Sequence, residues 1–453
     1  MLDKKQAVLA VSAGSLELKK KESSKDDLYV NLGLLGLCTN LYRAGYRNIK
    51  MFQGDRLEIC RFIGILEDNI NLKDLQNPLL LSMISFIQLS WVQKFTKMIK
   101  KKYPNVLIKL GGRYVVDECE EWLREKLPYV DFFCKGCPDD NAEILLLKED
   151  NPSVLFPQKP FEDLNYALLY NYERYQPSIE VGRGCCFKCD FCLESNYRQL
   201  KTRKPEDIIK ECKNLIDLYK DDQLNIYFES ALFCVDKKWC SEFRQLYEEG
   251  NFKFKWRCTS RVDIFRKEWL PDLSQAGLKV VDIGLESASS EILSVMNKAS
   301  QPEIYLKKAE ELIKAMSEYN VWAKVNIMIY AGETGKTLAE THNWLLKNKK
   351  YIKGVSVNPL TVYMSKKNTS PTINNVKINW DEVNEKGYWT FPYKMEDYKM
   401  LKDAGMSEKD YYDLKKVCYL PRDLDKRAAI FTLGSRFPQL TNSDFEQARN
   451  KTA

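Results

Sequence analysis

Short apolar segments alternate with longer amphipathic ones, and this alternation limits the folds open to the first third of the chain. The helix-like segments include 91–102 and 118–126. Strands separated by helices of about a dozen residues predict a parallel sheet with helices packed on its faces. We therefore expect an α/β fold that begins with a doubly wound sheet over residues 1–165. The strand-like segments are 7–11, 48–52, 80–86, 106–110 and 130–133.

The alternation stops in a stretch rich in proline and aromatic residues, 152–175, and then resumes. Six further strand-like segments, with helical segments between them, predict an open (β/α)6 barrel over residues 166–365, with its chemistry at the carboxyl ends of the strands. Residues 366–453 lack this alternation, and we expect a C-terminal extension on the substrate side. The six strand-like segments are 178–181, 224–228, 254–257, 280–284, 325–330 and 354–357.

Composition and charge exclude several classes of protein. The chain has 453 residues and a net charge of +7, from 70 basic and 63 acidic side chains whose signs are interleaved. A dedicated nucleic-acid binder usually concentrates positive charge on one face, so nucleic acid is not an expected partner. The longest apolar run, Leu79–Val92, falls short of the roughly 20 residues that a bilayer requires. We expect no membrane partner and, because no signal peptide is evident, a cytoplasmic protein.

Cysteines supply the sharpest functional signal. Cys185, Cys189 and Cys192 form a C-x3-C-x2-C pattern directly after the 178–181 strand. Three thiolates on one loop can hold three irons of a 4Fe–4S cluster and leave the fourth iron open to another ligand. A structural zinc site is the alternative, with Cys186 and Cys189 as one pair and Cys134 and Cys137 as the other.

This cysteine loop, with Phe191 just before its last cysteine, resembles that of the radical SAM superfamily. The resemblance covers about residues 175–365. It includes a G-x-E-S segment and the signatures M-N-K and G-E-T. The G-E-T signature is preceded here by Tyr330 and Ala331, where the family usually has glycine and proline. These pieces follow expected strand ends in the family's order. They are Tyr227–Ser230, Ile283–Ser287, Met296–Lys298 and Gly332–Thr334.

The resemblance implies an enzyme in which Cys185, Cys189 and Cys192 bind a 4Fe–4S cluster. S-adenosylmethionine (SAM) would bind the open iron and be cleaved reductively to a 5′-deoxyadenosyl radical, with the electron supplied by a donor such as flavodoxin or ferredoxin. Carried over position by position, the expected SAM contacts are Glu229, Ser230, Gly284, Glu286 and Ser287.

Residues 30–145 resemble the cobalamin-binding Rossmann-like domain that precedes the barrel in one branch of this superfamily. The glycine pair Gly111 and Gly112 would then contact the cofactor, although a tight turn explains the pair equally well. Cys137 stands where relatives usually have glutamate, and no D-x-H-x-x-G motif is present. Two interpretations stay open: cobalamin without a lower histidine ligand, or a scaffold without cobalamin. The matching pieces are 32–37, 43–46, 110–113, 128–131 and 135–137.

Cys258 follows the 254–257 strand and is a candidate catalytic donor of a hydrogen atom to a substrate radical, or else a small buried apolar residue. The resemblances together favour a cobalamin-dependent C-methyltransferase that acts on a natural product or peptide. A cobalamin-independent maturase such as a peptide epimerase is the alternative, and a zinc-stapled binding protein is a third. Radical tRNA methylthiolation fits less well, because the N-terminal part shows no second cysteine set and the C-terminus no RNA-binding barrel.

Overall fold

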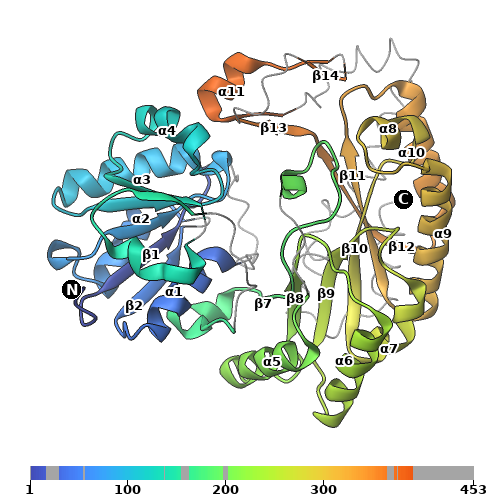
Figure 1. Ribbon diagram of the computed structural model, residues 1–453, viewed down its shortest axis with the longest axis horizontal. Coiled ribbons are helices and arrows are strands. Elements are labelled where there is room, and N and C mark those ends of the chain that lie inside the picture. Colours follow the sequence, from blue (N-terminus) through green and yellow to red (C-terminus); the bar gives the residue numbers. More distant parts are fainter. Residues whose placement is uncertain are drawn as a thin grey trace. The chain divides into compact units, whose positions relative to one another are not determined.

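The computed structural model describes residues 2–16, 30–54, 57–136, 138–154, 163–196, 202–364, 372–374 and 376–390. The chain divides into two compact units (Figure 1), and each is described by itself. Among the described residues, the N-terminal unit contains those up to 175 together with 363–364 and 379–389, and the barrel unit contains 176–362 with most of 372–378. No helix in these ranges has the length and apolar character needed to cross a bilayer.

The N-terminal unit is built on a six-stranded sheet in the order β2-β1-β3-β4-β5-β6, and every neighbouring pair is parallel. The strand order reverses between β1 and β3, as in doubly wound sheets of the flavodoxin type, where ligands bind beyond the carboxyl ends of the strands. The expected parallel α/β sheet is therefore confirmed. Its strands are β1 (Val8–Ser12), β2 (Ile49–Gln53), β3 (Leu79–Ser82), β4 (Ile108–Gly111), β5 (Phe132–Gly136) and β6 (Asn151–Val154).

The helices of this unit cover both faces of the sheet. Helix α2 packs against α3, whereas α1 packs against a 3-10 segment at 139–146. The third strand is shorter than the sequence predicts, because Ser85 begins a 3-10 turn in which its side chain and that of Gln88 form a capping box. Strand β6 and helix α2 were not predicted. The helices are α1 (Leu32–Arg43), α2 (Ile59–Asn69), α3 (Leu89–Lys102) and α4 (Glu120–Lys126).

A buried polar network ties together the carboxyl ends of the first three strands. The Asn31 amide group donates to Ser12 Oγ at 3.1 Å and to Ser82 Oγ at 3.0 Å, and its Oδ1 caps α1 through the Leu34 N–H. Gln88 donates to the Ala13 carbonyl at 2.6 Å. Because each of these side chains is hydrogen-bonded, the network is stable in a buried position and fixes the edge where β1 and β3 diverge.

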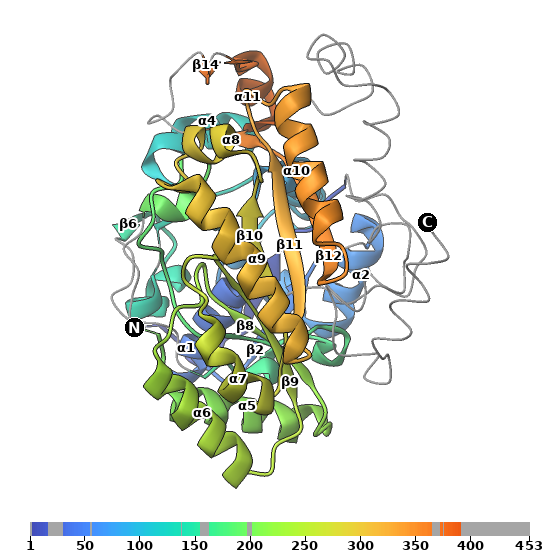
Figure 2. The ribbon, with the colours of Figure 1, turned by 90° about the vertical axis from the view of Figure 1, so that its right-hand side faces the viewer.

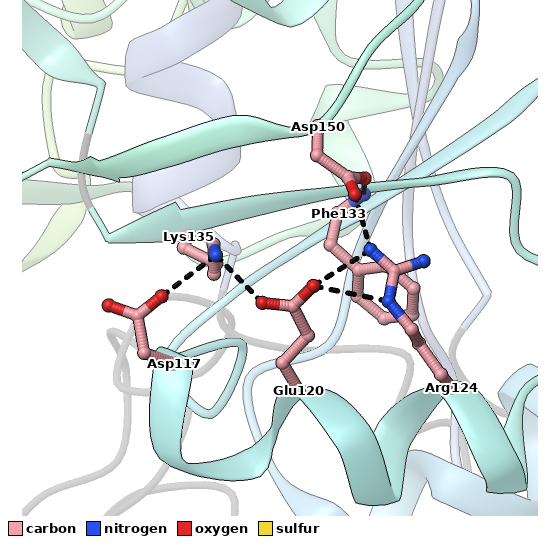
Figure 3. Close-up of polar contacts among 6 residues, drawn as sticks. All are labelled: Asp117, Glu120, Arg124, Phe133, Lys135 and Asp150. Atoms are coloured by element: carbon pink, nitrogen blue, oxygen red, sulfur yellow. Dashed lines mark hydrogen bonds and ion pairs between the residues drawn. The ribbon is translucent and has the colours of Figure 1, made fainter.

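A second network holds α4 to β5 (Figure 3). Lys135 Nζ on β5 lies 2.8 Å from Asp117 Oδ1 and 2.7 Å from Glu120 Oε2. Arg124, one turn along α4, pairs with Glu120 and Asp150. The pKa of Glu120 is lowered by its hydrogen bonds to Lys135 and Arg124. These partly exposed charges fix the position of a short helix that buries little apolar surface of its own.

Part of the C-terminal extension packs within the N-terminal unit. Helix α11 (Trp380–Lys386) accepts a 2.8 Å hydrogen bond from Trp122 Nε1 at the Asn384 carbonyl. The ring of Tyr363 lies 5.0 Å from that of Tyr114, and Gly387 lies directly over Phe86. These contacts bury an aromatic cluster beside the carboxyl ends of β3 and β4. Residues 391–453, which make up most of the expected C-terminal extension, lie outside the described residues.

The barrel unit has six parallel strands that follow one another in sequence order, and helices follow the strands as the sequence predicts. Figure 2 shows helices α5, α6, α7, α9 and α10 on one side of this sheet. The partial (β/α)6 barrel is therefore confirmed. Its strands are β7 (Ser178–Glu180), β8 (Asn225–Glu229), β9 (Lys255–Ser260), β10 (Leu278–Glu286), β11 (Trp322–Ile329) and β12 (Ile352–Pro359), and its helices are α5 (Pro205–Tyr219), α6 (Lys237–Glu249), α7 (Leu270–Gln275), α8 (Ser290–Val295), α9 (Pro302–Glu318) and α10 (Gly335–Lys347).

The two faces of the barrel sheet differ in chemistry. Phe228 of β8 stacks on Trp256 of β9 at 4.4 Å, and both rings contact Phe243 of α6, so this face is covered by helices. Successive side chains of a strand point to opposite faces. On the other face, Tyr227 and Thr259 share a hydrogen bond of 2.9 Å. We call the face that carries Tyr227 and Thr259 the polar face.

Candidate functional site

The three motif cysteines lie on the loop that follows β7. Cys189 is buried, whereas Cys185 and Cys192 are half-buried. The Cys185 and Cys192 thiols are close enough to interact electrostatically, and the Cys192 N–H donates to the Cys189 carbonyl at 3.0 Å. Within the described ranges, no three or more His, Cys, Asp or Glu side chains converge as they would around a metal ion. The fit to a 4Fe–4S cluster therefore lies in the chemistry and spacing of three thiols on one loop.

The alternative zinc site finds no further support. Cys186 is exposed on the same loop, and Cys134 is buried in the N-terminal unit. Cys137 lies outside the described residues, so the second pair of this site is not described as a whole.

The M-N-K segment after α8 holds the cysteine loop in place. The Asp190 N–H donates to the Met296 carbonyl at 3.2 Å. Asn297 donates from Nδ2 to the Lys188 carbonyl at 2.9 Å, and its own backbone has a φ of 53°. Asparagine tolerates this left-handed conformation better than most residues. The two hydrogen bonds place the segment between Cys185 and Cys192 against the turn that follows α8.

Glu229 is the last residue of strand β8, and Ser230 follows it directly. Among the described residues, no group hydrogen-bonds to Glu229 Oε2 or to Ser230 Oγ, although both atoms are buried. Burial raises the pKa of Glu229 to about 7, against the opposing effect of Arg257. A buried carboxylate without a hydrogen-bond donor is costly, so a bound cation or ammonium group would relieve this position. The expected contact with the SAM amino group fits this observation.

A row of charges crosses the polar face behind Glu229. Asp282 of β10 lies 2.7 Å from Arg257 of β9 and 2.7 Å from Lys324 of β11, and its side chain is 3% exposed. The Arg257 guanidinium lies 4.7 Å from the centre of the Tyr227 ring. Sequence reasoning missed this row. Its signal is the alternation of polar and apolar residues along β8 and over residues 255–259 of β9, together with a single aspartate in the apolar middle of β10.

Glu286, at the carboxyl end of β10, has an unusual backbone. Its φ is 70°, beside an irregularity in the pairing of β10 with β11. Its Oε1 lies 3.1 Å from Lys298 Nζ. A Cβ at Gly284 would come within 2.7 Å of the same oxygen, so a side chain at 284 would displace the Glu286 carboxylate from this position. Non-glycine residues with positive φ are costly and cluster at functional sites, which agrees with the expected role of Glu286.

Ser287 and Gly332–Thr334 serve the packing of α10. Ser287 is fully buried, lies 3.2 Å from Thr341 Oγ1, and accepts a hydrogen bond from the Ser289 N–H. Thr334 caps α10. Burial raises the pKa of Glu333 to about 8, partly offset by a hydrogen bond from Thr337. The structure thus brings Cys189, Glu286 and Lys298 toward one region of the barrel but directs the Ser287 hydroxyl into the protein.

Cys258 is not among the residues brought together on the polar face. Strand β9 extends to Ser260, so Cys258 lies within the strand, on the same face as Trp256 and against α6. Burial raises the pKa of its thiol well above the usual value, and the thiol of Cys240 on α6 lies close to it. This placement agrees with a small buried apolar residue and offers no geometric basis for a hydrogen-donor role.

Gly111 and Gly112 end strand β4 in the N-terminal unit. Gly112 has a φ of 124°, and a Cβ there would lie 2.1 Å from the Met83 carbonyl oxygen. The close approach of two backbones therefore explains this glycine. The same edge exposes apolar side chains in the β3–α3 connection, since Ile84 is 47% and Ile87 is 37% exposed. Exposed apolar groups beside a switch point suit a large, partly apolar ligand.

Comparisons with known proteins agree with this geometry. The family model "Radical SAM superfamily" matches residues 179–345. A tRNA-2-methylthio-N(6)-dimethylallyladenosine synthase of Buchnera aphidicola is 26% identical over 55% of this chain and 60% of its own length. The chain thus spans less than two thirds of that curated relative.

Solved structures match over more of the chain. The cobalamin-dependent SAM radical enzyme OxsB, with aqua-cobalamin bound, has a TM-score of 0.62 and 13% identity, covering 98% of this chain and 79% of its own. The methyltransferase TsrM of Kitasatospora setae, with cobalamin and a [4Fe-4S] cluster bound, has a TM-score of 0.55 and 15% identity, covering 79% and 73%. These likenesses show a common fold. Residues 179–345 thus form a domain of the radical SAM superfamily, whose enzymes use a 4Fe–4S cluster and SAM.

Proposed function

We propose that the protein is a cobalamin-dependent radical SAM methyltransferase that methylates an unactivated carbon of a natural product or peptide. The observation that carries the radical SAM part is the cysteine loop after β7 together with Glu229 at the end of β8, whose buried Oε2 accepts no hydrogen bond from the described residues. The cobalamin part is supported by the strand order of the N-terminal unit and by the overall likeness to OxsB and TsrM.

Different residues of the barrel unit would bind the cluster and SAM. Cys185, Cys189 and Cys192 would hold the cluster, and Glu229 with Ser230 would bind the ammonium group of SAM. Glu286 would contact the SAM ribose or carboxylate from the end of β10. When bound, the cluster supplies one electron, which splits SAM into methionine and a 5′-deoxyadenosyl radical. The burial of Cys189 and of the Glu229 Oε2 and Ser230 Oγ atoms would help to keep water away from the place of reaction.

In the N-terminal unit, the carboxyl ends of β1, β3 and β4 would hold cobalamin, which supplies a carrier for the methyl group. Ile84 and Ile87 would pack on its apolar parts, and Gly111 and Gly112 would line the same edge. The chain's single histidine, His342, lies on α10 of the barrel unit, so we propose binding without a lower histidine ligand. A flavodoxin or ferredoxin would supply the electron.

Methylthiolation is the second candidate, and the sequence likeness to a methylthio-transferring synthase favours it. The two candidates differ in metal content, since the second needs another cluster. Methylation with one cluster predicts about four iron atoms per chain, and a second cluster raises the number to about eight.

The proposal is tested by reconstituting the chain anaerobically with iron and sulfide, with and without hydroxocobalamin, and by measuring iron and the corrin absorption after gel filtration. We expect about four irons and one retained corrin per chain. Ile84→Glu should weaken corrin retention, whereas Ile304→Glu, at a similarly exposed isoleucine of α9, should not. No retained corrin would contradict the cobalamin assignment, and about eight irons would favour methylthiolation.

A further inference from the structure

Arg261 contacts one of the motif cysteines directly. It lies just beyond β9, and its Nη1 donates to Cys189 Sγ at 3.1 Å. Both residues are buried, with 6% of each exposed. A cationic donor thus faces one of the three thiols that the proposed cluster would use.

Three groups fix the guanidinium in this position. Asp263 accepts from Nε at 2.9 Å and from Nη2 at 2.8 Å, in a two-pronged pair. The Lys298 carbonyl accepts from Nη2 at 2.6 Å, and the Phe187 ring lies 3.7 Å from Cζ. With Nε and Nη2 occupied, Nη1 remains for the sulfur. Arginine suits such a site because its planar fork satisfies several acceptors at once.

The charge on Arg261 is permanent. The guanidinium of an arginine stays protonated in proteins, and Asp263 pairs with this one through two hydrogen bonds. The positive charge and the N–H donor therefore act on Cys189 throughout the range in which the enzyme works.

We propose that Arg261 is a positioning residue that sets the reduction potential of the cluster through its hydrogen bond to Cys189 Sγ. The inference rests on the proposed role of the three cysteines. Reduction of [4Fe–4S]2+ to [4Fe–4S]+ by one external electron adds a negative charge that is shared by the cysteine sulfurs. A hydrogen-bond donor and a positive charge at sulfur favour the reduced state and raise the potential.

The test is a redox titration of the reconstituted full-length enzyme, with low-potential titanium(III) citrate as reductant and the electron paramagnetic resonance of the reduced cluster as readout. Arg261→Gln should make reduction about tenfold less favourable, which is about 59 mV for a one-electron couple. Arg261→Lys retains the charge but lacks the fork, and should shift the potential less, in the same direction. Arg244→Gln, which removes an arginine paired with Glu248 on the exposed side of α6, should leave the potential unchanged.

The outcomes separate the inference from the proposed function. If the wild type assembles no 4Fe–4S cluster, both fall. If the wild type and Arg261→Gln carry equal iron and equal potentials, the inference alone is wrong. If Arg261→Gln loses its cluster, Arg261→Lys decides: a potential lower than that of the wild type supports the inference, and an unchanged potential overturns it.

Discussion

At the scale of single residues, the polar face of the barrel contains a carboxylate whose interactions within the protein are incomplete. Burial raises the pKa of Glu229 and the positive charge of Arg257 opposes this, but this arginine already pairs with Asp282 at 2.7 Å. Glu180 and Asp282 act on Glu229 with like charge. Such an arrangement costs stability and is explained by a ligand that completes it.

Glu229→Gln should therefore stabilise the SAM-free protein at high pH. Since burial raises the pKa of Glu229 from 4.5 to about 7, the folded state binds more protons than the unfolded state between these values. Stability then falls as the pH rises through this range, by roughly 3 kcal/mol in total. Denaturant unfolding should show the variant more stable than the wild type at about pH 8, with the two converging toward about pH 5.

Glu268→Gln, at an exposed carboxylate before α7, is the matched control and should show no such pH-dependent gain. Equal stabilities of Glu229→Gln and the wild type at about pH 8 would show that Glu229 is not buried as a charge.

At the scale of elements, the turn after α8 acts as a clamp for the cysteine loop. The loop has no regular structure between 181 and 192 and depends on external hydrogen bonds for its shape. Met296 and Asn297 supply two of these, and Lys298 joins the same turn to Glu286. One short segment thus links the proposed cluster loop to the proposed SAM contact on β10.

Asn297→Gly should loosen the cysteine loop without straining the backbone. Glycine accepts the φ of 53° but removes the hydrogen bond to the Lys188 carbonyl. A lost hydrogen bond of about 1 kcal/mol predicts that a chelator removes cluster iron about fivefold faster. The control is Asn251→Gly, where the asparagine also has a positive φ, of 48°, in the turn before β9. Equal rates in the two variants would contradict the clamp.

The sequence predicted elements better than the directions of side chains. All six barrel strands were placed from their apolar segments, and the cysteines and Glu229 were placed at strand ends. The face on which Cys258 lies was not predicted, because the expected strand ended at 257 whereas β9 continues to Ser260. A side chain's face depends on its position within the strand, and a strand's end cannot be located that closely from one sequence.

Interactions between segments that are distant in the sequence could not be predicted either. The bond between Arg261 and Cys189 joins residues 72 positions apart, and no local pattern encodes it. Helix α2 could have been predicted from the sequence, because its buried residues follow helical spacing. These residues are Ile59, Phe62, Ile63 and Leu66. Strand β6 contains a proline near its start, which weakens the local signal of a strand.

At the scale of the whole molecule, the chain returns to its N-terminal unit after the barrel is complete. Residues 363–364 and 379–389 close the aromatic cluster around Phe86, at the edge where we propose that cobalamin binds. The stability of that edge therefore depends on a segment far along the chain, since Phe86 and Gly387, which are 301 positions apart, are in contact.

Gly387→Ala should destabilise the N-terminal unit. Gly387 has a φ of 84°, and a Cβ there would come within 2.6 Å of the Phe86 ring. The backbone strain alone costs about 1–2 kcal/mol, and thermal unfolding should show a lower transition temperature. Gly64→Ala is the matched control, because nothing lies within 4 Å of a Cβ at this position of α2. It should stabilise the helix by roughly 0.5–1 kcal/mol, and equal effects of the two variants would contradict the contact.

Cleavage of SAM by the reconstituted protein tests the central claim most directly. Incubated anaerobically with SAM and dithionite, the wild type and Cys186→Ala should both produce 5′-deoxyadenosine, measured by liquid chromatography and mass spectrometry. The variant in which Cys185, Cys189 and Cys192 are all replaced by alanine should produce none. Deoxyadenosine formed by that variant at the wild-type rate would contradict the account.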